Sequence, residues 1–121
     1  MPHVRRIGLE AEDRAASYLQ ARGFTILTRR YKAASGEIDL VALDGEVLVF
    51  VEVKLRKGRF FKPEEALGET KRSRILRASE SYLAAYEGPD REVRFDVVAI
   101  DPDGVRHHKE AFWPQSPADG D

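Results

Sequence analysis

Two apolar strands joined by a tight turn, with charge gathered at their far ends, constrain this chain more than any other feature. Residues 36–54 read GEIDLVALDGEVLVFVEVK, and the Asp44-Gly45 pair near their middle is a strong signal for a two-residue turn. With these two residues as the loop, partner positions sum to 89, and alternate residues along each strand share a face. We therefore expect an antiparallel hairpin with one wholly apolar face that must be buried.

The opposite face of this hairpin gathers acids at the end away from the turn. The apolar face holds Ile38, Leu40, Ala42, Val47, Val49, Val51 and Val53. On the other face the register sets Glu37 directly against Glu52, with Asp39 diagonal to Glu52 and Lys54 two residues further along. Like charges so close cost stability, and a single lysine cannot balance three acids. A hard divalent cation takes carboxylate oxygens and offsets that cost, so the cluster predicts a metal site, with an ion pair to Lys54 as the structural alternative.

Periodicity along the rest of the chain predicts two helices and three further strands. The helices are expected at 9–22 and 63–86, and the strands at 24–31, 93–100 and 105–113. Because the long helix joins the third strand of the chain to the fourth, those two strands can lie parallel. The sequence thus predicts an α/β fold of order α-β-β-β-α-β-β, with a mixed β-sheet of about five strands flanked by helices. We expect one domain over 1–113 and a disordered tail over 114–121.

Composition excludes several classes of protein. The 121 residues include no cysteine, which rules out disulfides and thiolate-bound zinc and fits a reducing cytoplasm. No apolar run approaches the roughly 20 residues of a membrane span, and the first residues lack the apolar segment of a signal peptide. We therefore expect a cytoplasmic protein without a membrane partner. The net charge of −1 carries no nucleic-acid signature, so such a role must rest on local clusters.

Basic residues do cluster on both sides of the acidic end of the hairpin. Between residues 54 and 77, nine lysines and arginines stand against three glutamates, a local charge of +6. A segment of this charge beside a metal site can follow a phosphate backbone. The candidate nucleic-acid-binding residues are Arg30, Lys32, Arg56, Lys57, Arg59, Lys62, Lys71 and Arg74. For the helical half, a solvent-exposed charged face is an equally good interpretation.

The acids and the lysine follow a known spacing. Asp39, twelve intervening residues and then Glu52-Val53-Lys54 resemble the D…ExK signature of the PD-(D/E)xK, or restriction-endonuclease-like, nuclease superfamily. More closely, GEIDLVA, VFVEVKLR and residues 8–19 resemble the YraN family of small bacterial proteins, and the likeness covers nearly all of residues 8–113. The resemblance implies a restriction-endonuclease-like fold and an endonuclease dependent on Mg²⁺ or Mn²⁺. Its implied substrate is DNA, above all structured or branched DNA.

The resemblance also implies roles for individual residues. By it Asp39 and Glu52 are metal ligands, the backbone carbonyl of Val53 is a candidate third ligand, and Lys54 orients or activates the attacking water. Glu37 is expected to act in catalysis beside them, as a further ligand or as support for one. These expectations place the chemistry at the charged end of the hairpin.

A further acid is expected on the first helix. Archaeal Holliday-junction resolvases place an acid there, and Glu12 is the matching position, although an exposed glutamate is the structural alternative. The chain departs from the superfamily at Ile38, where Pro is common, and from the family at Ala11, where Gly is common; neither position carries a catalytic group. Asp96, inside an apolar strand, is expected to pair with an arginine in a structural role.

Three functions of different classes stay open on the sequence. The first is a Mg²⁺- or Mn²⁺-dependent DNA endonuclease. The second is a nucleic-acid-binding module that keeps the fold and the metal site but relies on a partner for catalysis. The third is a protein-interaction domain that merely tolerates the acidic cluster. A homodimer suits the first function, because cutting two strands needs two sites.

Overall fold

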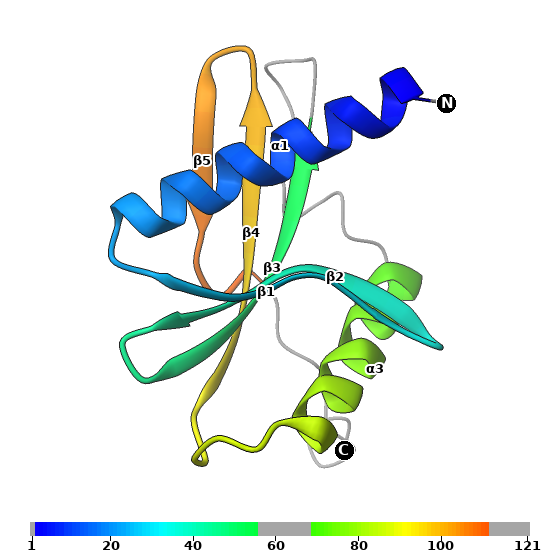
Figure 1. The fold of residues 1–121 in the computed structure, drawn as a ribbon, viewed down its shortest axis with the longest axis vertical. Coiled ribbons are helices and arrows are strands. Elements are labelled where there is room, and N and C mark those ends of the chain that lie inside the picture. The colour runs from blue at the N-terminus through cyan, green and yellow to red at the C-terminus, as the bar shows by residue number, and fades with distance from the viewer. Residues whose placement is uncertain (1, 56–68, 112–121) are drawn as a thin grey trace.

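The computed structural model of the chain describes residues 2–55 and 69–111, with side chains described over 10–55 and 70–111. The elements in chain order are α1 (Pro2–Ala21), β1 (Thr25–Ala33), β2 (Gly36–Asp44), β3 (Val47–Leu55), α3 (Glu69–Ala85), β4 (Val93–Asp101) and β5 (Gly104–His108). This is the predicted order α-β-β-β-α-β-β (Figure 1). The predicted basic loop over 56–62, the first turns of the helix expected from 63 and the tail over 114–121 lie outside the described residues.

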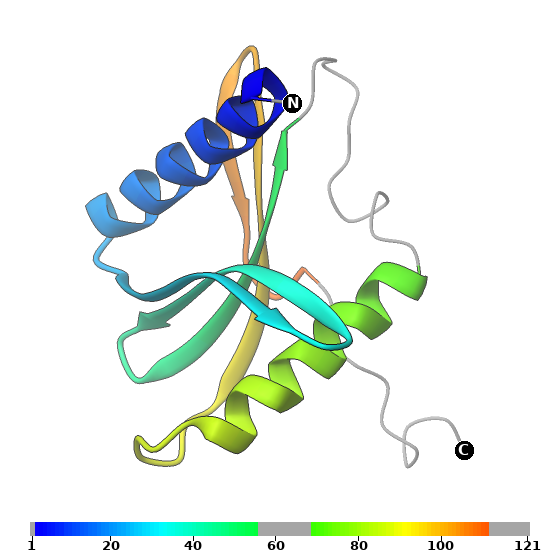
Figure 2. The same cartoon turned by 45° about the vertical axis from the view of Figure 1, so that its right-hand side comes forward.

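The five strands form one mixed sheet in the order β1-β2-β3-β4-β5. β3 and β4 are parallel, as the helical connection between them predicts, and every other neighbouring pair is antiparallel. Figures 1 and 2 show α1 on one face of the sheet and α3 on the other. The predicted α/β fold is therefore confirmed.

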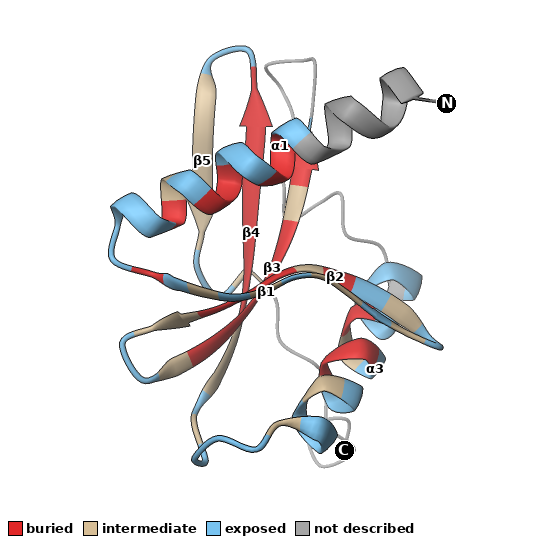
Figure 3. Cartoon of the chain, in the orientation of Figure 1, coloured by how far each residue is buried: buried red, intermediate tan, exposed pale blue. Residues whose placement is uncertain are grey.

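An apolar layer lies on each face of the sheet. The buried residues of the layer under α1 are Ala11, Ala15, Ala16, Leu19, Phe24, Leu40, Ala42, Val49, Val51, Val98 and Ile100. Those of the layer under α3 are Ile38, Val41, Leu48, Phe50, Ile75, Ala78, Phe95 and Val97. β3 and β4 contribute to both layers, which is why their sequences are apolar at successive positions rather than at alternate ones. Figure 3 shows the burial running along both strands.

The predicted register of the β2–β3 hairpin was wrong by two positions. Asp44 pairs with Val47, so partner positions sum to 91 and the loop consists of Gly45 and Glu46. Gly45, at the first loop position, has a φ of 61°, and Glu46, at the second, is not among the residues with positive φ; this combination is that of a type II′ turn, whereas the type I′ turn expected for Asp-Gly needs a positive φ at both positions. Because the shift is even, the side chains of the paired residues keep their predicted faces. Continued along the strands, the register sets Asp39, and not Glu37, at the level of Glu52.

The β1–β2 ribbon is strongly twisted and crosses the direction of β4 and β5 (Figures 1 and 2). Its register shifts between Ile26 and Thr28, and Arg30 has a φ of 54°, an uncommon conformation outside glycine. The twist carries Ile38 into the layer under α3, whereas the alternation of faces predicted it on the same layer as Leu40. It also brings the beginning of β2 beside α3.

Two predicted element boundaries were also wrong. α1 begins at Pro2 rather than at residue 9, because proline is favoured in a first helical turn while apolar periodicity, the signal used, starts later. β5 ends at His108 rather than at 113, and Glu110, with a φ of 53°, turns the chain out of the strand direction. None of the helices in the described part of the chain is both long and apolar enough to cross a bilayer.

Candidate active site at the fork between β2 and β3

β2 and β3 separate beyond the Leu40–Val51 pair, while β3 stays paired with β4 as far as Leu55. In the fork so formed, the carboxylate of Asp39 accepts a hydrogen bond from the backbone N–H of Val53, at 2.7 Å between Oδ2 and N. Where the two backbones diverge, the Asp39 carboxylate therefore accepts the hydrogen bond that a backbone carbonyl of β2 would otherwise accept from β3. This hydrogen bond fixes the carboxylate against β3.

Glu52 and Lys54 lie on the α3 side of β3, and both are buried, with 7% and 6% of their surface exposed. Lys54 Nζ lies 3.6 Å from Glu52 Oε1, and Lys71 Nζ, which comes from α3, lies 2.8 Å from the same oxygen. Buried charges are costly unless they are paired. Glu52 is thus held between one lysine of its own strand and one lysine of the neighbouring helix.

Glu12 reaches the same region from α1 and is also buried, at 7% exposure. Arg30 Nε donates a hydrogen bond to Glu12 Oε1 at 2.7 Å. This hydrogen bond, together with the charge of Glu12 and more weakly the charges of Glu37 and Asp39, raises the pKa of the Arg30 guanidinium. Glu12 is therefore not an exposed helix glutamate, and Arg30 contacts an acid of the cluster.

Burial and neighbouring charge shift the pKa of two groups in this cluster. Burial first, and then the charges of Glu52 and Glu12, raise the pKa of the Asp39 carboxyl to about 7, against the opposing effects of the Val53 N–H and of Lys71. Burial is the largest single influence on the pKa of the Lys71 ammonium and acts to lower it, but the hydrogen bonds to Glu52 and Lys54 and the charges of Glu52 and Asp39 together outweigh burial and leave that pKa raised. The protein thus favours the neutral form of Asp39 and the charged form of Lys71.

The cluster as a whole is balanced, with three carboxylates matched by three cationic groups. The carboxylates belong to Glu12, Asp39 and Glu52, and the cations to Arg30, Lys54 and Lys71. The shortage of positive charge inferred from the hairpin alone is made up by residues of β1 and α3. Sequence reasoning placed Lys71 and Arg30 among the residues that contact nucleic acid and missed their contacts with the acids, because only tertiary packing creates those contacts.

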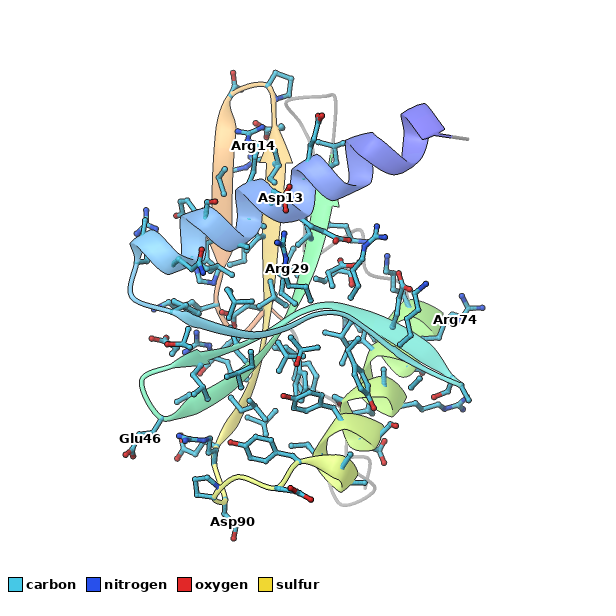
Figure 4. The ribbon with its side chains drawn as sticks, viewed as in Figure 1. Asp13, Arg14, Arg29, Glu46, Arg74 and Asp90 are labelled. Carbon is cyan, nitrogen blue, oxygen red and sulfur yellow. The ribbon has the colours of Figure 1, made fainter. Side chains whose placement is uncertain are left out.

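Glu37 is exposed, unlike Glu52, and it lines a groove of about 690 Å³ together with Lys32, Lys71 and Arg74. Figure 4 shows Arg74 on α3 beside the ribbon of β1 and β2. The described candidates for nucleic-acid binding therefore divide between this groove and the acidic cluster. The remaining candidates, Arg56, Lys57, Arg59 and Lys62, lie outside the described residues.

Asp13, the residue next to Glu12 on α1, forms an exposed ion pair, in contrast to the buried pair of Glu12. Asp13 is paired with Arg29 of β1, and both side chains are largely exposed (Figure 4). An exposed pair of this kind contributes little to stability. Asp13 therefore offers a matched control for substitutions in the buried cluster.

The donor set of the cluster fits Mg²⁺ or Mn²⁺. Over residues 10–55 and 70–111, no three acidic or histidine side chains are placed to hold an ion together. Mg²⁺ is nevertheless commonly held by only one or two carboxylates, with water and substrate phosphate completing its shell. Asp39 and Glu52 are hard oxygen donors of this number. Burial and the charges of Glu52 and Glu12 raise the pKa of Asp39, and a cation beside its carboxylate would oppose these effects.

Asp96 forms a second buried charge network, which lies under α1. Its carboxylate accepts two hydrogen bonds from Arg94, at 2.8 and 2.9 Å, one from the backbone N–H of Glu110 at 3.1 Å, and pairs with His107 Nε2 at 2.7 Å. Burial acts to raise the pKa of Asp96, but these partners outweigh it and lower that pKa. The predicted structural pairing of Asp96 with an arginine is confirmed.

The fold and the site together define a small α/β protein that gathers an aspartate, a glutamate and a lysine, spaced as D…ExK, at a fork in its sheet. The chain belongs to the Uncharacterised protein family UPF0102, which matches residues 11–100, and the resemblance to the YraN family is thereby confirmed.

Curated relatives from several bacteria are similar over most of their length. The UPF0102 protein of Symbiobacterium thermophilum is 46% identical over 99 residues, covering 81% of this chain and 84% of the relative. The UPF0102 protein of Anaeromyxobacter dehalogenans is 44% identical over 111 residues, covering 88% and 83%. That of Chlorobium chlorochromatii is 38% identical over 118 residues, covering 88% and 91%. The family match over residues 11–100 includes the second half of α1, strands β1 to β3, α3 and nearly all of β4.

Proposed function

We propose that this protein is a metal-dependent endonuclease that hydrolyses phosphodiester bonds in DNA, with structured or branched DNA as its substrate class. The observation that carries the proposal is the convergence of Asp39, Glu52 and Lys54 at the fork, beside a groove lined by basic residues. Glu12 stands close enough for its charge to act on Asp39. The D…ExK resemblance and the groove support DNA as the substrate.

Each residue of the cluster has a distinct part in this proposal. Asp39, Glu52 and the carbonyl of Val53 are the residues that would hold Mg²⁺ or Mn²⁺, and the ion would supply positive charge at the reacting phosphate. Glu12 would join them as a ligand once its side chain leaves Arg30, which now donates a hydrogen bond to it. Lys54 is buried and fixed beside Glu52, so its ammonium can orient a water and stabilise negative charge without reorganising. Glu37 lines the groove, where the DNA substrate would lie next to the metal ligands.

A second function is favoured by the charge balance of the cluster. Lys71 lies 2.8 Å from Glu52, and Arg30 lies 2.7 Å from Glu12, so side chains of the protein already pair with these carboxylates, and no metal ion is needed to offset their charge. A nucleic-acid-binding module that keeps the fold but relies on a partner for catalysis would show the same pairing. The two functions differ in one measurable property, which is cleavage by the purified protein.

The decisive experiment is cleavage of labelled single-stranded, duplex, flap and four-way-junction DNA in Mg²⁺ or Mn²⁺. It compares the parent with Asp39→Asn, and with Asp13→Asn as a matched control in an exposed pair. The endonuclease proposal requires cutting by the parent and by Asp13→Asn, and none by Asp39→Asn. Binding to one of these DNAs without any cutting would refute the endonuclease and support the binding module.

The setting of this activity follows from the same reasoning. The lack of cysteine fits the cytoplasm, where DNA and free Mg²⁺ are both present. A homodimer would bring two sites to the two strands of a duplex. Light scattering of the protein alone and with a four-way junction tests the dimer, since only two copies on one junction agree with it.

A further inference from the structure

The groove and the acidic cluster are neighbours that share a residue. The groove lies between the turn from β1 to β2 and the described beginning of α3. Its lining includes the cations Lys32, Lys71 and Arg74 against the single acid Glu37, with Ile75 as an apolar part. Gly36 sets the spacing of the two walls, since a Cβ added there would lie 2.7 Å from the carbonyl oxygen of Arg74. The groove is thus a built feature with three cationic side chains on its walls.

Lys71 belongs to both places at once. Its Nζ lies 2.8 Å from Oε1 of Glu52, yet 45% of its side chain is exposed, against 8% for the side chain of Glu52. The lysine therefore stands at the boundary between the buried carboxylate and the open groove. Its flexible four-carbon stem allows the ammonium to turn from one to the other.

An anion in the groove would compete with Glu52 for this ammonium. A phosphate flanked by Lys32 and Arg74 would draw Lys71 by charge and by hydrogen bonding. Once Lys71 has turned away, Glu52 Oε1 keeps its ion pair with Lys54, whose Nζ lies 3.6 Å from it. A buried carboxylate that has lost its closest partner gains more from binding a cation.

We infer that the groove is a subsite for a backbone phosphate of nucleic acid, and that its occupancy draws Lys71 off Glu52 and so strengthens divalent-cation binding there. The inference rests on the proposed function, for which it supplies the surface that holds the substrate and a coupling between substrate and cofactor. Because linkage is reciprocal, the cation must tighten nucleic-acid binding by the same factor.

The test measures this coupling without any cleavage. The probe is a short, labelled, phosphorothioate single-stranded oligonucleotide, whose binding is followed by fluorescence anisotropy with and without Mn²⁺ at constant ionic strength. Paramagnetic resonance of Mn²⁺ measures ion binding in the absence of the oligonucleotide. The proteins are the parent, Lys71→Met and, as a matched control, Arg74→Met, and thermal unfolding verifies that each variant is folded.

The inference predicts a different outcome for each protein. In the parent, Mn²⁺ tightens oligonucleotide binding about fivefold or more, which is the usual lower range of such coupling. Lys71→Met binds Mn²⁺ several-fold more tightly than the parent without oligonucleotide and loses most of the coupling, because Glu52 is already released. Arg74→Met binds the oligonucleotide more weakly but keeps both the Mn²⁺ affinity of the parent and the coupling. Lys71→Gln repeats the test if Lys71→Met does not fold.

Failure of this inference is distinguishable from failure of the proposed function. A Lys71→Met protein with the Mn²⁺ affinity and the coupling of the parent would overturn the inference. A parent that cuts DNA but shows no coupling would also overturn it and would leave the endonuclease standing. A parent that shows the coupling and cuts no DNA would support the inference within a binding module and refute the endonuclease.

Discussion

The carboxylate of Asp39 accepts the backbone N–H of Val53 across the fork between β2 and β3, and this same carboxyl group has a pKa of about 7. A hydrogen bond from an N–H favours the charged form, so the raised pKa means that burial and the charge of Glu52 outweigh the hydrogen bond. Near neutral pH, Asp39 is therefore close to half protonated. Its charge depends on what else enters the fork.

Stability in metal-free buffer is expected to fall as pH rises from about 4 to about 7. The folded state binds the Asp39 proton more tightly than the unfolded state, in which the pKa is about 3.9. The contribution of Asp39 is therefore complete below the unfolded pKa and is lost as pH rises through 7. Three pKa units correspond to at most about 4 kcal/mol of unfolding free energy. Urea unfolding at pH 5 and pH 8 measures the change.

Asp39→Asn is the matched test of this pH dependence, since the amide keeps an acceptor for Val53 but does not titrate. We expect the variant to lose most of this fall in stability, while Asp13→Asn keeps it. Saturating Mg²⁺ should also reduce the fall in the parent, because the cation favours the charged carboxylate. An Asp39→Asn protein that loses stability with pH as steeply as the parent would assign the effect to another group.

Replacement of Lys54 is expected to separate metal binding from cutting. Asp39→Asn and Glu52→Gln should abolish both, because they remove ligand charge. Lys54→Ala should bind Mn²⁺ as the parent does and lose cleavage by about a hundredfold or more, since Lys71 still pairs with Glu52. Calorimetric titration with Mn²⁺ and initial cleavage rates give the two readouts. Parent-like metal binding by both acid variants would show that the ion is held elsewhere.

Substitutions of Glu12 and Arg30 test whether Glu12 is a metal ligand or only the ion-pair partner of Arg30. If Glu12 is a ligand, Glu12→Gln weakens Mn²⁺ binding, whereas Arg30→Met strengthens it by releasing Oε1 from the contact at 2.7 Å. Both effects are expected to be about tenfold, the size of effect that a residue supporting a metal site has. Equal stability losses in the two variants, without any change in Mn²⁺ affinity, would reduce Glu12 to a structural partner of Arg30.

Asp96→Asn is expected to destabilise the fold without changing the cleavage activity of the folded protein. The change leaves Arg94 and His107 facing an amide in a site where Asp96 is fully buried. Breaking a buried ion pair in this way costs about 3 kcal/mol or more. Urea unfolding measures the loss, and cleavage per folded molecule should equal that of the parent. A specific loss of cleavage in a fully folded Asp96→Asn protein would contradict a purely structural role.

Much of the fold follows from the sequence because local signals agree with one another. The apolar runs around Val49 and Val98 identify the central strands, and the long helix between β3 and β4 fixes their parallel pairing. The turn was harder to predict, because Asp44-Gly45-Glu46 can place glycine at either central position of a two-residue loop. Only the packing of the whole hairpin selects between those two registers, which decide whether Asp39 or Glu37 stands level with Glu52.

The sequence predicts which acids of the site come together better than it predicts which cations pair with them. Asp39, Glu52 and Lys54 come from one hairpin, so their spacing alone places them together. Lys71 reaches Glu52 only after α3 has packed on the sheet, and Arg30 reaches Glu12 only through a backbone conformation with positive φ. No short-range pattern in a chain signals such contacts. Ile38 changed layers for the same reason, since ribbon twist is a property of the assembled sheet.

The pairing of the buried acids with the protein's own cations separates folding from cofactor supply. In zinc fingers the ion is part of the folding reaction, and the chain is unfolded without it. Here Lys54 and Lys71 pair with Glu52, and Arg30 pairs with Glu12, so these buried charges are offset by the polypeptide itself. Under the proposed function, the fraction of molecules that carry an ion would then be set by the free ion concentration at each moment, and not by the conditions during synthesis.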